Sequence, residues 1–292
     1  MKKLILSLLL ISLLGCNDNN INNSNTNESH NTISVKEKVE QPAVETVEET
    51  SVEDVEIQPM TIEIGKSTVL YPASDGLDIS ADLYLIDETS PLFVLFHKAS
   101  WSRGEYKDTA LKLNKMGYNA MAVDQRSGFT CNGILNETAK RATEKGFPTN
   151  HSDAAMDVNA SIQYAIDHFD TDIYVMGSSY SASLVLILSQ TYTENIKGIF
   201  AFSPGEYFSY DGGSIADNTQ KLTIPTFITS ASYETDDWQH IFDSVGSDYK
   251  FAFYPEGFGK HGSESLWDST KDNSEFWIAI EYFLEQIEED AD

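Results

Sequence analysis

The sequence predicts an α/β fold built on a mostly parallel sheet of about eight strands, with helices on both faces and a small cap or none. Short apolar runs alternate with segments of helical spacing along most of the chain, which is typical of strand-helix-strand units. The run from Pro91 to Phe96 is apolar throughout, as expected of a strand buried on both faces of a parallel sheet. Strand patterns before this alternation indicate an antiparallel hairpin in front of it.

The elements follow in chain order from these patterns. Thr61 to Ile64 and Thr68 to Tyr71 have strand patterns, and Ile79 to Ile86 is their antiparallel successor across a turn at residues 74–76. Later strands are expected after Pro91 at Asn119 to Val123, from Asp172, at Ile196 to Phe202, Thr223 to Thr229 and Lys250 to Tyr254. Helices are expected at Tyr106 to Met116, Ala154 to Phe169, from near Tyr180, at Trp238 to Phe242 and at Ser274 to Ile287.

The N-terminus has the pattern of an export signal. Two lysines precede an apolar run from Leu4 to Leu14, which is shorter than the roughly 20 residues of a membrane-spanning helix. Residues 13–16, LLGC, resemble the lipobox of bacterial lipoproteins. The resemblance implies a signal peptide at 1–15, lipidation of Cys16 and attachment to a membrane surface of the bacterial cell envelope, periplasmic or extracellular. The alternative is an ordinary secretory signal with a coincidental cysteine.

Residues 16–58 are rich in polar and acidic side chains and contain no aromatic residue. Such a segment cannot bury enough apolar surface to offset its ordering entropy, so we expect a flexible tether. Residues 59–292 then form one domain. Once Cys16 is lipidated, Cys131 has no intramolecular disulfide partner, and we expect it to be a small buried or semi-exposed residue and not a nucleophile.

The 292-residue chain carries a formal net charge of -27. This charge argues against nucleic acid or anionic lipid as a partner surface, since both would be repelled. The sequence contains no metal-ligand spacing and no phosphate-binding glycine loop, so we expect no metal and no cofactor.

A serine-rich turn follows the strand that begins at Asp172. The sequence GSSYS at residues 177–181 fits a small-x-Ser-x-small turn, in which a strand passes sharply into a helix and exposes one serine at the helix N-terminus. Ser181 stands where the full pattern has glycine. Ser179 is therefore the candidate nucleophile, and the alternative is a serine-rich helix cap after a buried strand.

A serine nucleophile needs a base and an acid that orients the base. His261 lies on the glycine-rich loop GFGKHG at residues 257–262, after the last predicted strand, and is the best candidate base. Glu234 is the preferred acid because it falls in the loop before the next helical pattern. Asp236 is the alternative acid, although we expect it to N-cap that helix, with Asp237 in the first turn.

The order serine, acid, histidine, each on a loop after a strand, resembles the α/β-hydrolase superfamily from about Thr61 to the C-terminus. Residues 96–100, FHKAS, are similar to the oxyanion loop of the family, and residues 122–128, AVDQRSG, are similar to its strand and D-x-R-x-G turn. The resemblance implies an oxyanion hole made by the backbone N–H groups of Ala99, or Lys98, and of Tyr180. It also implies that His97 braces this loop and is not a second base. We expect the Lys98 side chain to be solvated.

These features predict a serine hydrolase that cleaves an ester or thioester of a small substrate through an acyl-enzyme on Ser179. The segment 203–222 is short where many members of the superfamily carry a large cap, which favours an open site of the dienelactone-hydrolase-like kind. A peptidase of the same superfamily and a non-catalytic lipoprotein that uses the fold only for binding are the alternatives.

Overall fold

The computed structural model of the protein describes residues 64–289, which lie within one compact unit of the chain. The predicted signal peptide, Cys16 and the tether lie outside the described residues. So does most of the first predicted strand, at 61–63.

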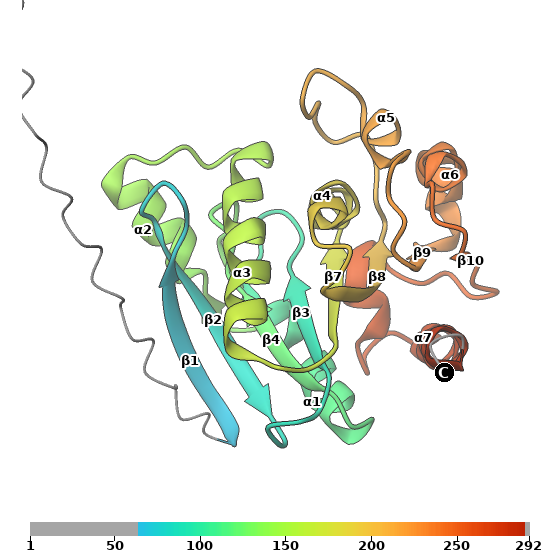
Figure 1. The fold of residues 1–292 in the computed structure, drawn as a ribbon, viewed down its shortest axis with the longest axis horizontal. Helices are drawn as coiled ribbons and strands as arrows, with labels where there is room; N and C mark the ends of the chain where they lie inside the picture. Colours follow the sequence, from blue (N-terminus) through green and yellow to red (C-terminus); the bar gives the residue numbers. More distant parts are fainter. Residues whose placement is uncertain (1–63, 290–292) are drawn as a thin grey trace, which may run out of the picture. The chain divides into compact units, whose positions relative to one another are not determined.

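One eight-stranded sheet organises the described residues, in the order β1-β2-β4-β3-β7-β8-β9-β10 (Figure 1). Only β2 runs antiparallel to its neighbours, and all the other adjacent pairs in this sheet are parallel. The predicted mostly parallel sheet is therefore confirmed. The strands of this sheet are β1 (Gly65–Pro72), β2 (Asp78–Leu85), β3 (Leu92–Phe96), β4 (Asn119–Val123), β7 (Ile173–Ser178), β8 (Ile196–Phe202), β9 (Thr226–Thr229) and β10 (Lys250–Phe253).

Helices cover both faces of the sheet (Figure 1). The helices are α1 (Lys107–Lys115), α2 (Glu137–Lys145), α3 (Ala155–His168), α4 (Tyr180–Leu188), α5 (Ile215–Thr219), α6 (Thr235–Ser244) and α7 (Asn273–Glu289). Short 3-10 turns are η1 (Arg103–Tyr106), η2 (Ser152–Ala154), η3 (Ser189–Thr191), η4 (Ser232–Glu234) and η5 (Gly262–Leu266), and a small hairpin is formed by β5 (Thr130–Cys131) and β6 (Ile134–Leu135).

Two apolar layers hold the helices to the sheet. Along β3, side chains alternate between them: Val94 and Phe96 belong to the layer under α3 and α4, whereas Phe93 and Leu95 belong to the layer under α1 and α7. Every residue of β3 is buried, as its uninterrupted apolar sequence predicts. The burial of both faces makes the sheet the rigid part of the domain.

The structure corrects three details of the sequence-based elements. The strand expected at Thr68 to Tyr71 is part of one continuous strand, β1, whose pairing with β2 extends from Pro72 back to Gly65. The helix expected to begin at Tyr106 starts as the 3-10 turn η1 and becomes α1 at Lys107. Helix α2 was not predicted, because its sequence ETAKRATEK is almost wholly polar and buries only three small side chains.

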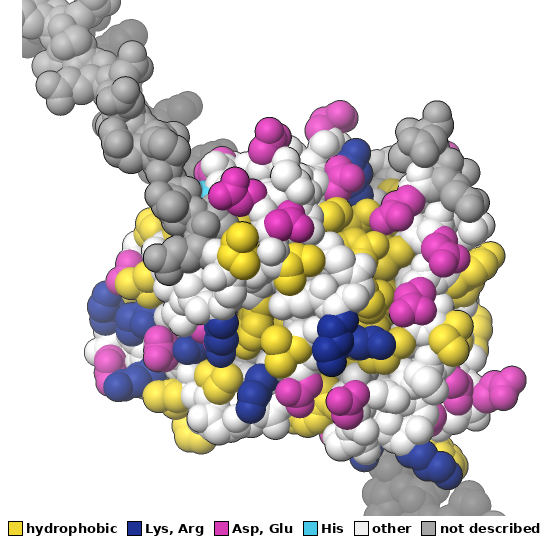
Figure 2. All heavy atoms as spheres, turned by 90° about the horizontal axis from the view of Figure 1, so that it is seen from below, with side chains coloured by type: hydrophobic (Ala, Val, Ile, Leu, Met, Phe, Trp, Pro, Cys, Tyr) yellow, Lys and Arg dark blue, Asp and Glu magenta, His cyan; other side chains and the backbone are white. Residues whose placement is uncertain are grey.

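Charge is dispersed over the face shown in Figure 2. On that face, Asp and Glu side chains lie among Lys, Arg and hydrophobic side chains and do not form one acidic patch. None of the helices in the described part of the chain is both long enough and apolar enough to span a bilayer.

Candidate active site

The segment from β7 into α4 has the geometry of a nucleophile turn. Ser179 lies between the two elements with φ 61° and ψ -124°, a conformation that a non-glycine residue rarely adopts. A Cβ atom on Gly177 would stand 2.4 Å from the carbonyl oxygen of Ser181, which explains why the position before this turn needs glycine. The Ser179 side chain therefore leaves the sheet at the carboxyl end of β7.

The structure brings Ser179, His261 and Glu234 together. His261 Nε2 is 2.8 Å from Ser179 Oγ, and His261 Nδ1 is 2.7 Å from Glu234 Oε1. These residues come from three loops that follow β7, β9 and β10, and they are 82 and 27 positions apart in sequence. In this arrangement the hydroxyl can give its proton to the imidazole while the carboxylate holds the other ring nitrogen.

Ser203 holds the second oxygen of Glu234. The Ser203 hydroxyl donates to Glu234 Oε2 at 2.6 Å and accepts from the Gly262 N–H at 2.8 Å, so it joins the acid to the loop of the histidine. Burial alone would raise the pKa of Glu234, but the hydrogen bonds with His261 and Ser203 outweigh it and lower that pKa below its ordinary value. The carboxyl group is therefore held in its charged form.

The predicted N-cap role of Asp236 is wrong. Helix α6 begins at Thr235, which makes Glu234 the residue at the N-cap position and places Asp236 and Asp237 together in the first turn. The Glu234 side chain makes no capping hydrogen bond, because it faces His261 and Ser203 instead. Among the described contacts, Asp236 has none with His261.

The resemblance names the backbone N–H groups of Lys98, Ala99 and Tyr180 as candidates for the oxyanion hole. The Lys98 N–H donates to Glu105 Oε2 at 2.7 Å, so it is already engaged. Within residues 64–289, neither the Ala99 nor the Tyr180 N–H donates a hydrogen bond. Of the two loop amides left open by the sequence, only the Ala99 N–H has no acceptor among the described residues.

His97 braces the loop that carries Ala99. Its ring is fully buried, with Nδ1 2.8 Å from the Lys98 carbonyl oxygen and Nε2 accepting from the Gln125 N–H at 3.0 Å. Burial lowers the pKa of His97 to about 4, so the ring is neutral at physiological pH. Ser181 adds to this bracing, because its hydroxyl donates to the His97 carbonyl oxygen at 2.6 Å.

The Lys98 side chain is not solvated as expected. Its ammonium group pairs with Glu264 at 2.8 Å, lies 3.2 Å from the His261 carbonyl oxygen and stands 3.6 Å from the centre of the Trp101 ring. The Trp101 and Trp267 rings stack at 5.2 Å. These contacts fasten the loop after β3 to the segment that follows His261.

A hollow of about 360 Å³ lies beside the nucleophile turn. It is lined by uncharged side chains and one imidazole, at Ser127, Thr149, Asn150, His151, Ser152, Tyr207 and Phe208. The His151 ring stacks on Tyr180 at 4.5 Å, and the Tyr207 side chain lies beside that of Ser179. Two residues that line this hollow, His151 and Tyr207, thus lie against Tyr180 and Ser179.

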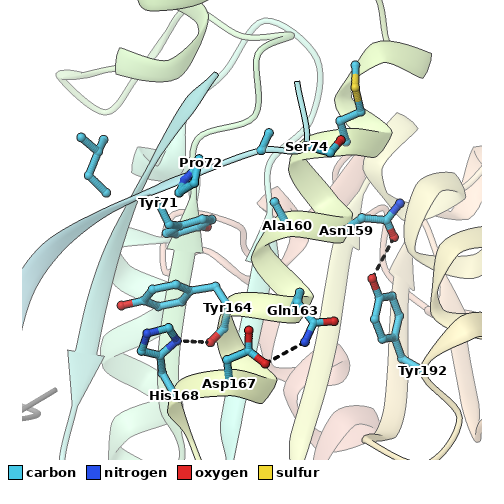
Figure 3. Close-up of a pocket in the computed structure, with 13 residues that line it drawn as sticks. Tyr71, Pro72, Ser74, Asn159, Ala160, Gln163, Tyr164, Asp167, His168 and Tyr192 are labelled. Carbon is cyan, nitrogen blue, oxygen red and sulfur yellow. Dashed lines mark hydrogen bonds between the residues drawn. The ribbon is translucent and has the colours of Figure 1, made fainter. Parts of the chain in front are cut away.

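A larger hollow, of about 670 Å³, lies between β1 and α3, and none of the predicted site residues lines it (Figure 3). Its polar groups are bonded to one another: Gln163 donates to Asp167, and Tyr192 donates to Asn159. The Tyr164 and His168 rings stack at 4.1 Å. Volume alone therefore does not locate the chemistry in this molecule.

The sequence-based search did not single out Ser203 or His151, and it noted Tyr207 only as an aromatic residue of the short loop 203–222. Ser203 directly follows β8, so the rule that placed Ser179 after a strand could have found it. Tyr207 and His151 lie in irregular loops, and only the folded chain places them beside Ser179 and Tyr180. Cys131 is free and buried, and burial raises its pKa to about 12, so it is not a reactive thiol.

Residues 64–289 contain no group of three or more His, Cys, Asp or Glu side chains arranged to hold a metal ion. The hydrogen-bonded Ser179, His261 and Glu234 side chains are groups that can perform proton transfer and nucleophilic attack by a hydroxyl.

The sheet order, with the nucleophile turn after its central strand, is that of the α/β-hydrolase fold. An esterase from Pyrococcus furiosus has a TM-score of 0.57 and 16% identity, over 76% of this chain and 93% of its own. A dienelactone hydrolase from Anabaena variabilis has a TM-score of 0.57 and 11% identity, over 75% and 97%. Est1E from Butyrivibrio proteoclasticus, solved with ferulic acid bound, has a TM-score of 0.55 and 17% identity, over 75% and 99%.

These similarities establish the fold. No protein-family model and no curated protein matches the sequence.

Proposed function

We propose that the protein is a serine hydrolase that cleaves an ester or thioester of a small substrate through an acyl-enzyme on Ser179. One observation carries this proposal: the hydrogen-bonded series from Glu234 through His261 to Ser179, with distances of 2.7 and 2.8 Å. Groups of this kind in this order form the machinery by which a serine hydroxyl becomes a nucleophile.

Each group has a role in the reaction. Ser179 Oγ attacks the acyl carbon while His261 Nε2 takes its proton, and Glu234 stabilises the imidazolium through Nδ1. The Ala99 and Tyr180 N–H groups donate to the oxyanion of the tetrahedral intermediate. His261 then protonates the departing alcohol or thiol, and water repeats the sequence on the acyl-enzyme.

The neutral hollow beside Ser179 supports a small, uncharged substrate. Its aromatic rings can contact apolar parts of a ligand, and its hydroxyl and amide groups can bond to polar parts. Tyr207 is 42% exposed, and the segment between β8 and β9 contains one helix, α5, of five residues, which supports a site without a large cap. Such a site suits the short acyl esters and thioesters that we propose as substrates.

A fluorophosphonate probe tests the proposal directly. We expect it to label the wild-type protein and not Ser179→Ala, and the hydrolysis of 4-nitrophenyl acetate should fall at least about 10³-fold in that variant. Ser189→Ala is the matched control, because the Ser189 hydroxyl is buried and has no hydrogen-bond partner among the described residues. Equal labelling of Ser179→Ala and wild type would contradict the assigned nucleophile.

A panel of short acyl esters, thioesters and aminoacyl amides separates the substrate classes. Higher kcat/KM on esters or thioesters supports the proposal, whereas higher kcat/KM on the amides identifies a peptidase. No labelling and no turnover with any compound would favour a protein that uses the fold for binding.

We also propose that Cys16 carries a lipid that anchors the protein to a membrane surface of the bacterial cell envelope. The support is the charged N-terminus, the short apolar run and the LLGC sequence at residues 13–16. The segment 16–58 would then hold the hydrolase domain away from the headgroups.

A further inference from the structure

Glu105 is a fully buried carboxylate that the proposed reaction does not use. It lies on η1, directly after the loop that carries Ala99, and its side chain has no exposed surface. No cation in the described part of the chain forms an ion pair with it, and the ammonium group of Lys98 is committed to Glu264. A buried carboxylate without a counter-ion is unfavourable unless hydrogen bonds satisfy it.

Three donors satisfy the Glu105 carboxylate. Oε2 accepts from the Lys98 N–H at 2.7 Å, and Oε1 accepts from the hydroxyls of Ser178 at 2.7 Å and Ser263 at 2.6 Å. The Ser178 oxygen also accepts from the Ser263 N–H at 2.9 Å. One carboxylate thus links three segments, two of which are 73 and 158 positions away in sequence.

Each of the three donors neighbours a part of the candidate site. Lys98 precedes Ala99, Ser178 precedes Ser179, and Ser263 follows His261 by two residues. The packing between the last two segments is tight, because a Cβ atom on Gly262 would stand 2.2 Å from Ser178 Oγ. A displacement of one segment is therefore passed to the others.

The charge of Glu105 suits this arrangement better than a neutral side chain would. An unprotonated carboxylate accepts from all three partners without a hydrogen of its own, whereas a protonated one would add a buried O–H donor that needs an acceptor. Burial raises the pKa of Glu105, while the hydrogen bonds from Ser263, Ser178 and Lys98 oppose this rise. An apolar residue would be the simpler choice if stability were the only requirement at this position.

We propose that Glu105 is a positioning residue, whose carboxylate holds the amide of the loop after β3, the nucleophile and the histidine loop in their reactive alignment. The inference rests on the proposed hydrolase function. It assigns Glu105 no contact with the substrate.

Glu105→Gln is the first test, on the full chain. Glutamine has the same shape, but one of its oxygens is replaced by an NH₂ donor. This group must face either the Lys98 N–H or the two serine hydroxyls, all of which are donors to Glu105. We expect kcat for 4-nitrophenyl acetate to fall about 10- to 100-fold, less than the 10²- to 10³-fold typical of deleting an oxyanion donor. KM should change by less than about threefold, since the interaction acts on the transition state.

Ser263→Ala is the second test, and it keeps the inference falsifiable if Glu105→Gln does not fold. It removes one donor and leaves the carboxylate in place, so a smaller loss of kcat is expected. In the double variant the two losses should not multiply, because both act through the same carboxylate. Multiplicative losses would contradict a shared mechanism.

Asn119→Ala is the matched control. Asn119 is also fully buried and also links three backbone groups, accepting from the Ile86 N–H and donating to the carbonyl oxygens of Asp87 and Ser90. It lies at the start of β4, whereas the candidate site lies beyond the carboxyl ends of the strands. We expect Asn119→Ala to lower the urea midpoint and to leave kcat within about twofold of wild type.

Failure of the positioning role can be distinguished from failure of the hydrolase function. If the wild type is labelled by the fluorophosphonate and hydrolyses the ester, but folded Glu105→Gln and Ser263→Ala keep its kcat, the positioning role is wrong and the hydrolase function stands. If the wild type neither reacts with the probe nor turns over any ester or thioester, the hydrolase function fails and the positioning role fails with it.

Discussion

Besides Ser100, two described serines have a positive φ: Ser179 and Ser203, at 61° and 53°. Each directly follows a strand of the sheet, and each N–H bonds across to the end of the next strand: Ser179 to Phe202 and Ser203 to Thr229. Such conformations cost on the order of 1–3 kcal/mol and persist where the surroundings fix them. Here they occur at the two hydroxyls that contact His261 and Glu234.

The choice between Glu234 and Asp236 can be decided at single residues. Glu234→Gln keeps the shape of the side chain but loses the charge that orients and stabilises His261, so kcat should fall by about 10² to 10⁴. Asp236→Asn should leave kcat within about twofold, because Asp236 lies in the first turn of α6. Steady-state kinetics of both variants on one ester measure the two values of kcat. A larger loss in Asp236→Asn than in Glu234→Gln would assign the role of the acid to Asp236.

His97 should make stability depend on pH. Its pKa is about 4 when buried and about 6.5 when the chain is unfolded, so the unfolded state binds the proton first. The neutral His97 ring therefore contributes to the free energy of unfolding. Its contribution is fully present above pH 6.5 and is lost as the pH falls toward 4, by up to about 3 kcal/mol. Urea unfolding of wild type and His97→Asn at pH 7 and pH 4.5 checks it.

Wild type should lose more free energy of unfolding than His97→Asn between these two pH values. Parallel losses in the two proteins would show that His97 does not titrate as described.

At the scale of elements, the passage from β7 into α4 depends on one missing side chain. Gly177→Ala would place a methyl group 2.4 and 2.6 Å from backbone atoms of Ser181 and Ala182, which cannot move without shifting α4. We expect a loss of about 1–3 kcal/mol in unfolding free energy together with a large loss of esterase activity.

Gly198→Ala, on the neighbouring strand β8, is the comparison. Its Cβ atom would approach only side chains, at 3.0 Å from Ile287 and 3.2 Å from Tyr174. Thermal unfolding and ester hydrolysis should change much less than in Gly177→Ala. If Gly177→Ala and Gly198→Ala lost similar stability and activity, the close backbone contact at Gly177 would not be the cause of the losses.

Elements with a strong apolar pattern were predictable. The bounds expected for β4 and β8 match the structure residue for residue, because both strands are mostly apolar and a polar residue directly follows each. The start of α6 was misplaced because a sequence with three successive acceptors, Thr235, Asp236 and Asp237, does not reveal which residue precedes the first turn. Helix α2 carried too little apolar periodicity to be recognised.

The candidate site was predictable where its residues immediately follow strands or stand among glycines. Ser179 and His261 had such signals, and the structure brings them within hydrogen-bond distance. Glu105 had no such sequence signal, because its partners lie on three loops that meet only in the folded chain. Long-range hydrogen bonds of this kind leave no trace in spacing or composition.

At the scale of the whole molecule, Cys16 can be tested independently of the hydrolase. In a bacterial host fed an alkyne-tagged fatty acid, the wild-type protein should incorporate the tag and sediment with membranes, whereas Cys16→Ser should do neither. Cys131→Ser is the matched control, since the Cys131 thiol is buried in the domain. Tagging of Cys16→Ser at the wild-type level would exclude the proposed anchor.

The strands of the eight-stranded sheet are joined by backbone ladders, and its inner strands β3, β4, β7 and β9 are wholly buried. The parts of the candidate site, in contrast, are joined to one another by side chains such as Glu105, Ser203 and Lys98. Side-chain links of this sort are released at lower free energy than a buried ladder. On warming, we therefore expect turnover to cease while circular dichroism still reports intact secondary structure. The temperature at which activity is lost would then report the stability of the loops that form the site. The melting temperature would report the stability of the sheet beneath them.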